Sequence, residues 1–367
     1  VLAQAQYAYM EKYIATASIR YDKTYKFAPK ARGGYFPGVS AAWIINKESF
    51  MEGIQAIDLL KLRAGYGVTG NSDIQPFLYQ DAFSTSTTYN DKVVAVAQRM
   101  ANDNLGWESA HMSSVGLDMR FLDRINATID LYSTNNKNLL LDVPQAPSTG
   151  FTAYTANVGT VNNKGIEISA DADIIKRKDL RWNLGINVGL NRNTVVYLPN
   201  GAFRRGFGSP MVEQIVAEGQ DIYTWYMPEW AGVDPETGDP LWWSYEKETD
   251  ESGATLYYVL DKRGNPTSEK STTETSHPVY TGNREAVNNY SKADYRMVGS
   301  ATPKFTGGLT TDLTWKNWSL GANLYLVYGN KVYNSSRNTI DSDGSYIDYN
   351  MMSIDNGLGW VRWDPND

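Results

Sequence analysis

The sequence predicts an all-β protein, a transmembrane antiparallel β-barrel of which about ten to twelve strands are present. Three observations lead to this fold class. Many segments alternate apolar and polar residues, short connections alternate with long polar ones, and no run of about 18 apolar residues is available for a membrane-spanning helix. A barrel strand needs only one apolar face, so its hydropathy signal is weak.

The alternation is clearest in WNLGINVGLN, residues 182–191. Its apolar residues are Trp182, Leu184, Ile186, Val188 and Leu190, and only asparagines and glycines stand between them. Because successive side chains of a strand point to opposite faces, one face is apolar and the other is polar. A soluble sheet with one wet face gives the same pattern in a single strand, so repetition along the chain must decide.

The same period recurs in YIATASIRYD (13–22), INATIDLY (125–132), FTGGLTTDLTW (305–315) and WSLGANLYL (318–326). Their polar faces carry Asp, Asn, Arg, Thr and Ser in the middle of strands. A sandwich core would reject these side chains, whereas a water-filled lumen accepts them. We therefore predict that the Trp182 face meets lipid and the Asn183 face meets a wet lumen. Only a closed barrel pairs all backbone groups in hydrocarbon.

The connections sharpen this prediction. Very short ones at 10–12, 122–124, 176–180 and 316–317 alternate with long polar ones at about 72–105, 142–156 and 198–220. Short turns on one rim and long loops on the other are typical of outer-membrane barrels, whose short turns face the periplasm. Trp182, Trp315 and Trp318 stand beside the short turns on the apolar face, which predicts an interfacial aromatic girdle. Ordinary sheet packing would explain any single one of them.

Composition excludes several classes of function. Lys plus Arg number 34 against 41 Asp plus Glu, a net charge of −7, and the cations form no stripe, so nucleic acid is not an expected partner. The chain has no cysteine, which rules out disulfides and thiol chemistry. Only His111 and His277 could supply imidazole, which leaves little scope for a zinc site or a histidine-based triad.

Five segments also carry a family likeness. ARGGYFPGVSAAWIINKESFM (31–51), IDLLKLRAGYGVTGN (57–71), NDNLGWESAHMSSVGLDMRF (102–121), VPQAPSTGFTAYTANVGTVNNKGIEIS (143–169) and VGSATPKFTGGL (298–309) stand in this order. In the same order they resemble the second half of SusC/RagA-type TonB-dependent outer-membrane transporters of Bacteroidetes. The resemblance covers nearly the whole chain.

The resemblance implies a barrel of about 22 strands, plugged by an N-terminal domain and energised by the TonB complex through a TonB box. It implies a SusD-like lipoprotein as a cap and a dimer of transporter–lipoprotein pairs in the outer membrane of a Bacteroidetes-type Gram-negative bacterium. The implied function is import of large nutrients, oligosaccharides ahead of peptides. A passive porin or a surface adhesin is the alternative.

Residues 1–367 show no plug domain, TonB box or signal peptide, and the last residues, GWVRWDPND, do not form the usual closing strand. The first residues, VLAQAQYAYM, already have the pattern of a strand. We therefore expect one segment of a transporter barrel, truncated at both ends. Such a segment alone would leave two unpaired sheet edges in lipid.

Strand direction gives one prediction for residues 198–302. The strand that ends near residue 198 runs outward from a short turn, whereas 304–315 runs back to one, so an even number of spanning strands lies between them. We predict that IYTWYMPEWAGV (222–233) and LWWSYEK (241–247) form one spanning pair, with DPETGDP as their turn. Alternatively, 198–302 is entirely an extracellular elaboration.

The candidate ligand-binding residues are aromatic and arginine side chains of the long loops. They are Phe77, Tyr79, Phe83 and Tyr89 in the first long loop, and Phe203, Arg204, Arg205 and Phe207 in GAFRRGFG. Aromatic faces stack on sugars, and Arg donors bind hydroxyls or peptide carboxylates. Packing among loops or against a partner lipoprotein is the other explanation.

No catalytic or metal site is predicted. Asp341, Asp343 and Asp348 in DSDGSYID faintly resemble a calcium loop without its full spacing, so we expect a solvated loop. Glu167 and Asp171 share a strand face and could act as acid and base, but carboxylates of a lumen wall explain them more simply. We therefore expect no enzyme and no cofactor.

Overall fold

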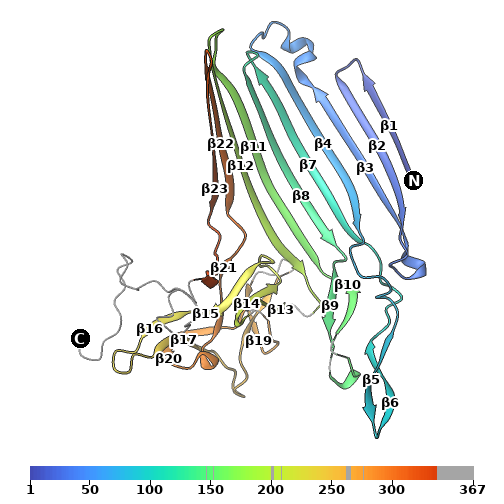
Figure 1. Ribbon diagram of the computed structural model, residues 1–367, viewed down its shortest axis with the longest axis vertical. Helices are drawn as coiled ribbons and strands as arrows, with labels where there is room; N and C mark the ends of the chain where they lie inside the picture. Colours follow the sequence, from blue (N-terminus) through green and yellow to red (C-terminus); the bar gives the residue numbers. More distant parts are fainter. Residues whose placement is uncertain are drawn as a thin grey trace. The chain divides into compact units, whose positions relative to one another are not determined.

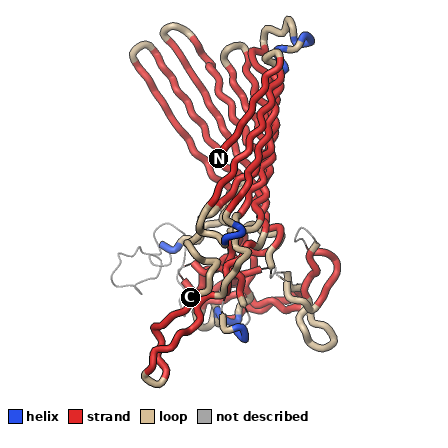
Figure 2. The backbone as a smooth tube through the Cα atoms, turned by 90° about the vertical axis from the view of Figure 1, so that its right-hand side faces the viewer, coloured by secondary structure: helices blue, strands red, loops and turns tan. Residues whose placement is uncertain are grey.

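The computed structural model describes residues 1–145, 147–151, 153–199, 202–207, 209–261, 266–275 and 277–336. The chain divides into two compact units (Figures 1 and 2). Unit 1 comprises Val1–Gly201, Glu218–Gln220 and Lys304–Tyr328, and unit 2 comprises Ala202–Ala217, Asp221–Pro303 and Gly329–Asp367. No helix among the described residues is long and apolar enough to cross a membrane.

Unit 1 is built on one ten-stranded antiparallel sheet. Its strands, in order across the sheet, are β1 (Leu2–Tyr9), β2 (Tyr13–Lys23), β3 (Gly33–Ile44), β4 (Ile57–Asn71), β7 (Glu108–Phe121), β8 (Ile125–Lys137), β11 (Thr160–Lys176), β12 (Leu180–Tyr197), β22 (Phe305–Trp315) and β23 (Trp318–Tyr328). The predicted all-β class and strand number are confirmed, and the sheet is part of a barrel wall.

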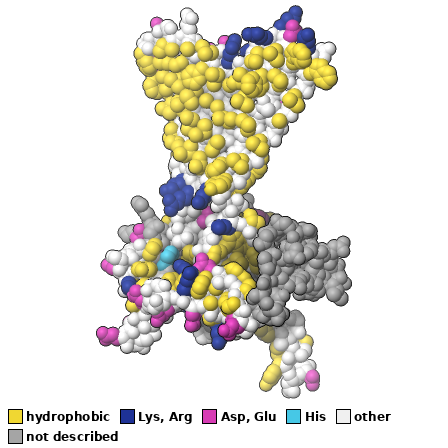
Figure 3. Space-filling view, turned by 90° about the vertical axis from the view of Figure 1, so that its left-hand side faces the viewer, with side chains coloured by type: hydrophobic (Ala, Val, Ile, Leu, Met, Phe, Trp, Pro, Cys, Tyr) yellow, Lys and Arg dark blue, Asp and Glu magenta, His cyan; other side chains and the backbone are white. Residues whose placement is uncertain are grey.

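The two faces of this sheet lie where the alternation predicts. The register pairs Ile168 with Val188 and Ile186 with Leu309, and Leu309 in turn with Leu324, so apolar side chains adjoin apolar ones from strand to strand. These side chains are open to the surroundings: Ile186 is 45% and Leu324 63% exposed. Figure 3 shows the resulting hydrophobic band over the sheet.

The short turns share one rim of the sheet, at the top of Figure 1. They join β1 to β2, β7 to β8, β11 to β12 and β22 to β23. The β3–β4 connection at the same rim holds the 3-10 turns η2 (Ile45–Lys47) and η3 (Ser49–Met51). Trp315 and Trp318 face each other across the last of these turns, and Trp182 lies near the start of β12.

The long connections of unit 1 share the opposite rim. The β2–β3 connection contains η1 (Pro29–Ala31), and the β4–β7 connection contains the hairpin of β5 (Ala82–Tyr89) and β6 (Lys92–Arg99). The β8–β11 connection contains β9 (Leu140–Pro144), η4 (Pro147–Thr149) and β10 (Ala153–Asn157). A small core of Phe27, Ala28, Tyr79 and Leu105 packs these loops together at this rim.

The strands of unit 2 form small sheets, and they lie between β12 and β22 in sequence. One sheet has the order β13 (Ala202–Phe207), β14 (Ser209–Ala217), β15 (Thr224–Pro228), β21 (Tyr295–Ser300). Another has the order β16 (Trp230–Val233), β17 (Pro240–Lys247), β20 (Tyr280–Val287), and β18 (Tyr257–Leu260) pairs with β19 (Pro266–Ser271). The 3-10 turn η5 (Tyr290–Lys292) precedes β21.

The predicted spanning pair in 222–247 is wrong. β12 pairs directly with β22, from Leu180 opposite Trp315 to Gly189 opposite Thr306, so no strand of the ten-stranded sheet lies between them. The local hairpin does form, because β16 pairs with β17 across DPETGDP, but it belongs to a sheet of unit 2. The deduction that an even number of spanning strands lies between β12 and β22 holds, because that number is zero.

Candidate functional site

The polar face of the ten-stranded sheet carries charged side chains that bind one another across strands. Arg63 on β4 donates from Nε to Asp118 on β7 at 3.0 Å and from Nη2 to Asp130 on β8 at 2.6 Å. Lys61 Nζ lies 3.4 Å from the second oxygen of Asp118. One guanidinium thus ties three neighbouring strands together, in a partly exposed network.

A glycine makes this reach possible. The register places Gly116 opposite both Arg63 and Asp130, between the two charged residues. A Cβ atom at Gly116 would lie 2.5 Å from Arg63 Cζ and 2.6 Å from Asp130 Oδ1. Because Gly116 on β7 has no side chain, the Arg63 side chain can extend across β7 to Asp130 on β8.

Gly165 on β11 has the same role for a neutral pair. Tyr132 on β8 and Asn191 on β12 both stand opposite Gly165, and the Tyr132 hydroxyl donates to Asn191 Oδ1 at 3.1 Å. A Cβ atom at Gly165 would meet the backbone oxygen of Leu190 at 2.2 Å. Glycines of the polar face thus allow side chains to lie along the sheet and bond two strands away.

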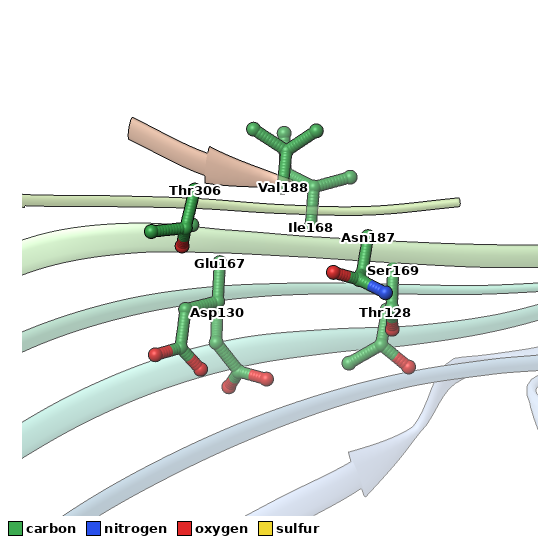
Figure 4. Close-up of a pocket in the computed structure, with 9 residues that line it drawn as sticks. Thr128, Asp130, Glu167, Ile168, Ser169, Asn187, Val188 and Thr306 are labelled. Carbon is green, nitrogen blue, oxygen red and sulfur yellow. The ribbon is translucent and has the colours of Figure 1, made fainter. Parts of the chain in front are cut away.

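A hollow of about 290 Å³ adjoins the Arg63 network on the polar face. Its polar lining comes from four strands: Thr128, Asp130, Glu167, Ser169, Asn187 and Thr306. Figure 4 shows Asp130 and Glu167 side by side, with Ile168 and Val188 directed to the opposite side of the strands. Asp130 is paired with Arg63, whereas no ion pair involves Glu167 within the described ranges. The hollow is a hydrophilic wall site, consistent with carboxylates that line a lumen.

The four predicted residues of the first long loop fall into two groups. Phe77 is half exposed, and its ring is tilted against those of Tyr25 and Tyr79, with ring centroids 6.1 and 6.4 Å apart. Tyr79 is only 7% exposed because it belongs to the small core of the rim, and its hydroxyl accepts from Arg32 at 3.5 Å. Tyr79 therefore offers little surface to a ligand in this conformation.

Phe83 and Tyr89 lie on the β5–β6 hairpin and are 61% and 77% exposed. The hairpin also exposes Val93 and Val96, so it presents an apolar surface to its surroundings. Phe77, Phe83 and Tyr89 remain candidates for ligand contact, on two separate parts of the same connection.

The other candidates cannot be placed in the same detail. Phe203, Arg204, Arg205 and Phe207 lie on β13, whose backbone pairs with β14, but their side chains lie outside the described residues. Asp341, Asp343 and Asp348 also lie outside the described residues. Within the described ranges, no group of three or more His, Asp or Glu residues is arranged to hold a metal ion.

Unit 2 contains a cluster of aromatic and arginine side chains that was not predicted from the sequence. The guanidinium of Arg296 on β21 lies over the rings of Tyr245 and Tyr280, 4.3 and 5.0 Å from their centroids, and 3.5 Å from a Glu229 oxygen. Arg284 on β20 stacks on Trp243 at 3.8 Å. Burial raises the pKa of Tyr280 to about 12. The aromatic run in 223–245 was visible in the sequence, but its interpretation as spanning strands concealed the cluster.

Three further aromatic residues at the short-turn rim were not predicted from the sequence. Tyr9, Tyr13 and Trp43 stack in a row across β1, β2 and β3, with centroids 6.4 Å apart in each pair. They accompany the predicted Trp182, Trp315 and Trp318 at the same rim. For Tyr9 and Tyr13 the signal was present, since they flank the short connection at 10–12, whereas Trp43 precedes the longer β3–β4 connection.

Comparison with known proteins agrees with this architecture. The family model described as TonB dependent receptor-like, beta-barrel, matches residues 1–366. The TonB-dependent receptor P3 of Formosa agariphila is 29% identical over 91% of this chain, and SusC of Bacteroides thetaiotaomicron is 33% identical over 53%. The solved RagAB peptide transporter superposes on 93% of this chain with a TM-score of 0.73 at 23% identity.

The alignments span a fifth to a third of these proteins: 32% of P3, 20% of SusC and 34% of the RagAB chain. The family match extends over nearly every residue, and the sheet has the two-faced pattern of a membrane barrel wall. The chain belongs to the β-barrel family of TonB-dependent receptors.

Proposed function

We propose that this chain forms part of the barrel wall of an outer-membrane importer for large nutrients, driven through TonB. The observation that carries the proposal is the two-faced sheet. One face is apolar and exposed across its strands, and the other holds Arg63, Asp118, Asp130 and Glu167 in the middle of strands. Such a wall suits a molecule with lipid outside and a hydrophilic interior.

The proposed partner is a SusD-like surface lipoprotein at the long-loop rim. Support comes from the likeness to SusC and to the RagAB complex, and from exposed Phe83 and Tyr89 on a hairpin of that rim. A two-stranded hairpin is at best marginally stable alone in water, so contact with a partner would stabilise it.

The proposed substrate is an oligosaccharide, with a peptide as the second candidate. The peptide is supported by the solved RagAB structure, which is titled a peptide transporter. Exposed aromatic faces together with arginine donors suit sugar rings, because several weak contacts of about 1 kcal/mol each can add along a chain of sugars.

Uptake in the source bacterium tests the proposal. Cells that lack the gene should lose growth on one polysaccharide or protein source and should fail to accumulate its fluorescent oligomers. Uptake in wild-type cells should cease when the proton-motive force is dissipated. Uptake that survives this treatment would instead indicate a passive porin, and normal uptake with lost surface attachment would indicate an adhesin.

Replacement of Phe203, Arg204, Arg205 and Phe207 together by alanine tests the loop candidates. We expect reduced uptake at normal surface expression, with single substitutions having modest effects. Unchanged uptake would show that these residues are structural and that capture lies elsewhere.

A further inference from the structure

The short-turn rim carries a cluster of cations without acidic partners. Arg177, Lys178 and Lys316 are exposed, and in the part of the chain that the structure describes none of them forms an ion pair. Four other cations of this rim form ion pairs: Lys12 with Glu48, Lys47 with Glu11, Arg120 with Asp123 and Lys176 with Asp173. Figure 3 shows Lys and Arg atoms gathered beyond the upper end of the apolar band.

Backbone bonds hold the turns of this cluster side by side. The N–H of Lys316 donates to the carbonyl of Asp179 at 2.8 Å, which joins the β22–β23 turn to the β11–β12 turn. The N–H of Asp173 donates to the carbonyl of Arg124 at 2.9 Å, which joins β11 to the β7–β8 turn. Arg124 therefore extends the cluster along the rim.

The cluster adjoins the rim end of the apolar face of the sheet. Arg177 donates its N–H to Leu180 at 2.9 Å, Leu180 stands opposite Trp315, and Trp315 stands opposite Trp318. These residues form one cross-strand row. Lys316 Nζ lies over the Trp315 ring, 5.5 Å from its centroid, so the charge and the indole occupy one site.

We propose that Arg177, Lys178 and Lys316, with Trp315 and Trp318, bind the phosphate groups of anionic phospholipids in the leaflet at the short-turn rim. The apolar band below the row matches acyl chains, indoles favour the interface, and guanidinium and ammonium groups bind phosphate oxygens. Three carboxylates of this rim, Glu52, Asp58 and Asp179, also lack an ion pair among the described residues. They are fewer than the four cations of the cluster with Arg124 included, which leaves a cationic excess. The inference rests on the proposed function, because it requires the apolar face to meet a bilayer.

The test uses the complete protein that contains this chain, reconstituted in phosphatidylcholine vesicles with a trace of spin-labelled phosphatidylglycerol or spin-labelled phosphatidylcholine. We expect the protein to retain phosphatidylglycerol at least about fivefold more strongly at low salt, as expected for basic residues near a lipid surface. The triple variant R177Q/K178Q/K316Q should lower this ratio close to one. Added salt should have the same effect on the wild type.

Two control variants separate this site from net charge. K12Q/K47Q/R120Q removes the same number of charges from paired positions of the same rim and should keep most of the preference. R177K/K316R keeps the charges and should also keep it. An unchanged ratio in the triple variant, or an equal fall in the paired control, would overturn the inference.

Insertion and uptake are measured in parallel. A wild-type protein that does not enter vesicles, or that does not transport in cells, would refute the proposed function itself. A wild-type protein that inserts and transports, with no lipid preference that depends on Arg177, Lys178 and Lys316, would refute only the lipid site.

Discussion

The two faces of the ten-stranded sheet use one backbone ladder in opposite ways. On the apolar face, side chains such as Ile186 and Leu324 remain exposed and interact only by apolar contact. On the polar face, Arg63, Asp118 and Tyr132 reach partners one or two strands away. The apolar face is suited to lipid, which solvates any hydrocarbon side chain without a specific contact. The stability of the polar face depends on specific hydrogen bonds and ion pairs.

The contrast shows where each face is vulnerable. A substitution on the apolar face should be judged by its transfer into lipid, and its cost depends on depth in the bilayer. A substitution on the polar face should be judged by the network that it interrupts. Variants of neighbouring residues in one strand can therefore separate the two rules.

The largest effect is expected from charge on the apolar face. Ile186→Arg or Leu324→Arg should destabilise the assembled barrel by about 2–4 kcal/mol near the bilayer midplane. Asn187→Arg and Asn323→Arg, one position away on the polar face, should be much milder. Unfolding by urea in lipid vesicles measures the difference, and equal costs on both faces would contradict the assignment of the faces.

A smaller effect is expected from filling the glycine gap at Gly165. Gly165→Ala places a methyl group 2.2 Å from the backbone oxygen of Leu190 and 2.6 Å from the Tyr132 hydroxyl, so β11 or β12 must shift. We expect a loss of about 1–3 kcal/mol, typical of overpacking. Gly67→Ala is the control, because the nearest atom lies 4.0 Å away, and it should be neutral or slightly stabilising.

Gly116→Ala should cost less, about 1 kcal/mol, because the obstructing atoms are the far ends of two partly exposed side chains, Arg63 and the Asp130 that it binds. The sign of the change in unfolding free energy is informative, since alanine by itself stabilises a strand more than glycine does. In the background of Arg63→Ala the same substitution should become neutral or stabilising. A cost that persists without Arg63 would show that the glycine has another role.

The smallest effect concerns acid stability at the short-turn rim. Tyr13, Trp43 and Lys12 donate to Glu48 at 2.7, 3.0 and 3.2 Å, and these bonds hold the pKa of the Glu48 carboxyl below its ordinary value of 4.5. A lowered folded-state pKa stabilises the fold above the unfolded-state value, and this contribution is lost as the pH falls through the folded-state pKa. Glu48→Gln should flatten the dependence of stability on pH below about 4.5, which urea unfolding at a series of pH values measures.

The sheet of unit 1 was predictable because lipid imposes a period of two over the whole length of each strand. A single exception, such as the apolar Ile14 at a polar position of 13–22, does not obscure this alternation. The short turns were also predictable, since they separate two alternating segments with almost no residues between them.

The pairing of β12 with β22 was not predictable from the same pattern. Strands of unit 2 such as β17 also have two faces, so LWWSYEK resembles a spanning segment although it pairs within a small sheet. The burial of Tyr79 was equally hidden. It depends on Phe27 and Leu105, whose approach is determined by the folded rim and not by local sequence.

The two ends of the main segment of unit 2 are fastened to each other. Thr302 Oγ1 donates to Asp221 Oδ1 at 2.9 Å, the N–H of Ala301 donates to the Tyr223 carbonyl at 3.0 Å, and β15 pairs with β21. Because the ends of this insertion lie close together, the flanking strands β12 and β22 are connected as if by a short loop. The conformational entropy of closing a loop grows only with the logarithm of its length, and a folded insertion removes most of that length. If unit 2 folds first, β12 and β22 can therefore pair as readily as the strands of a hairpin, and the length of the segment between them can change without a penalty to the wall.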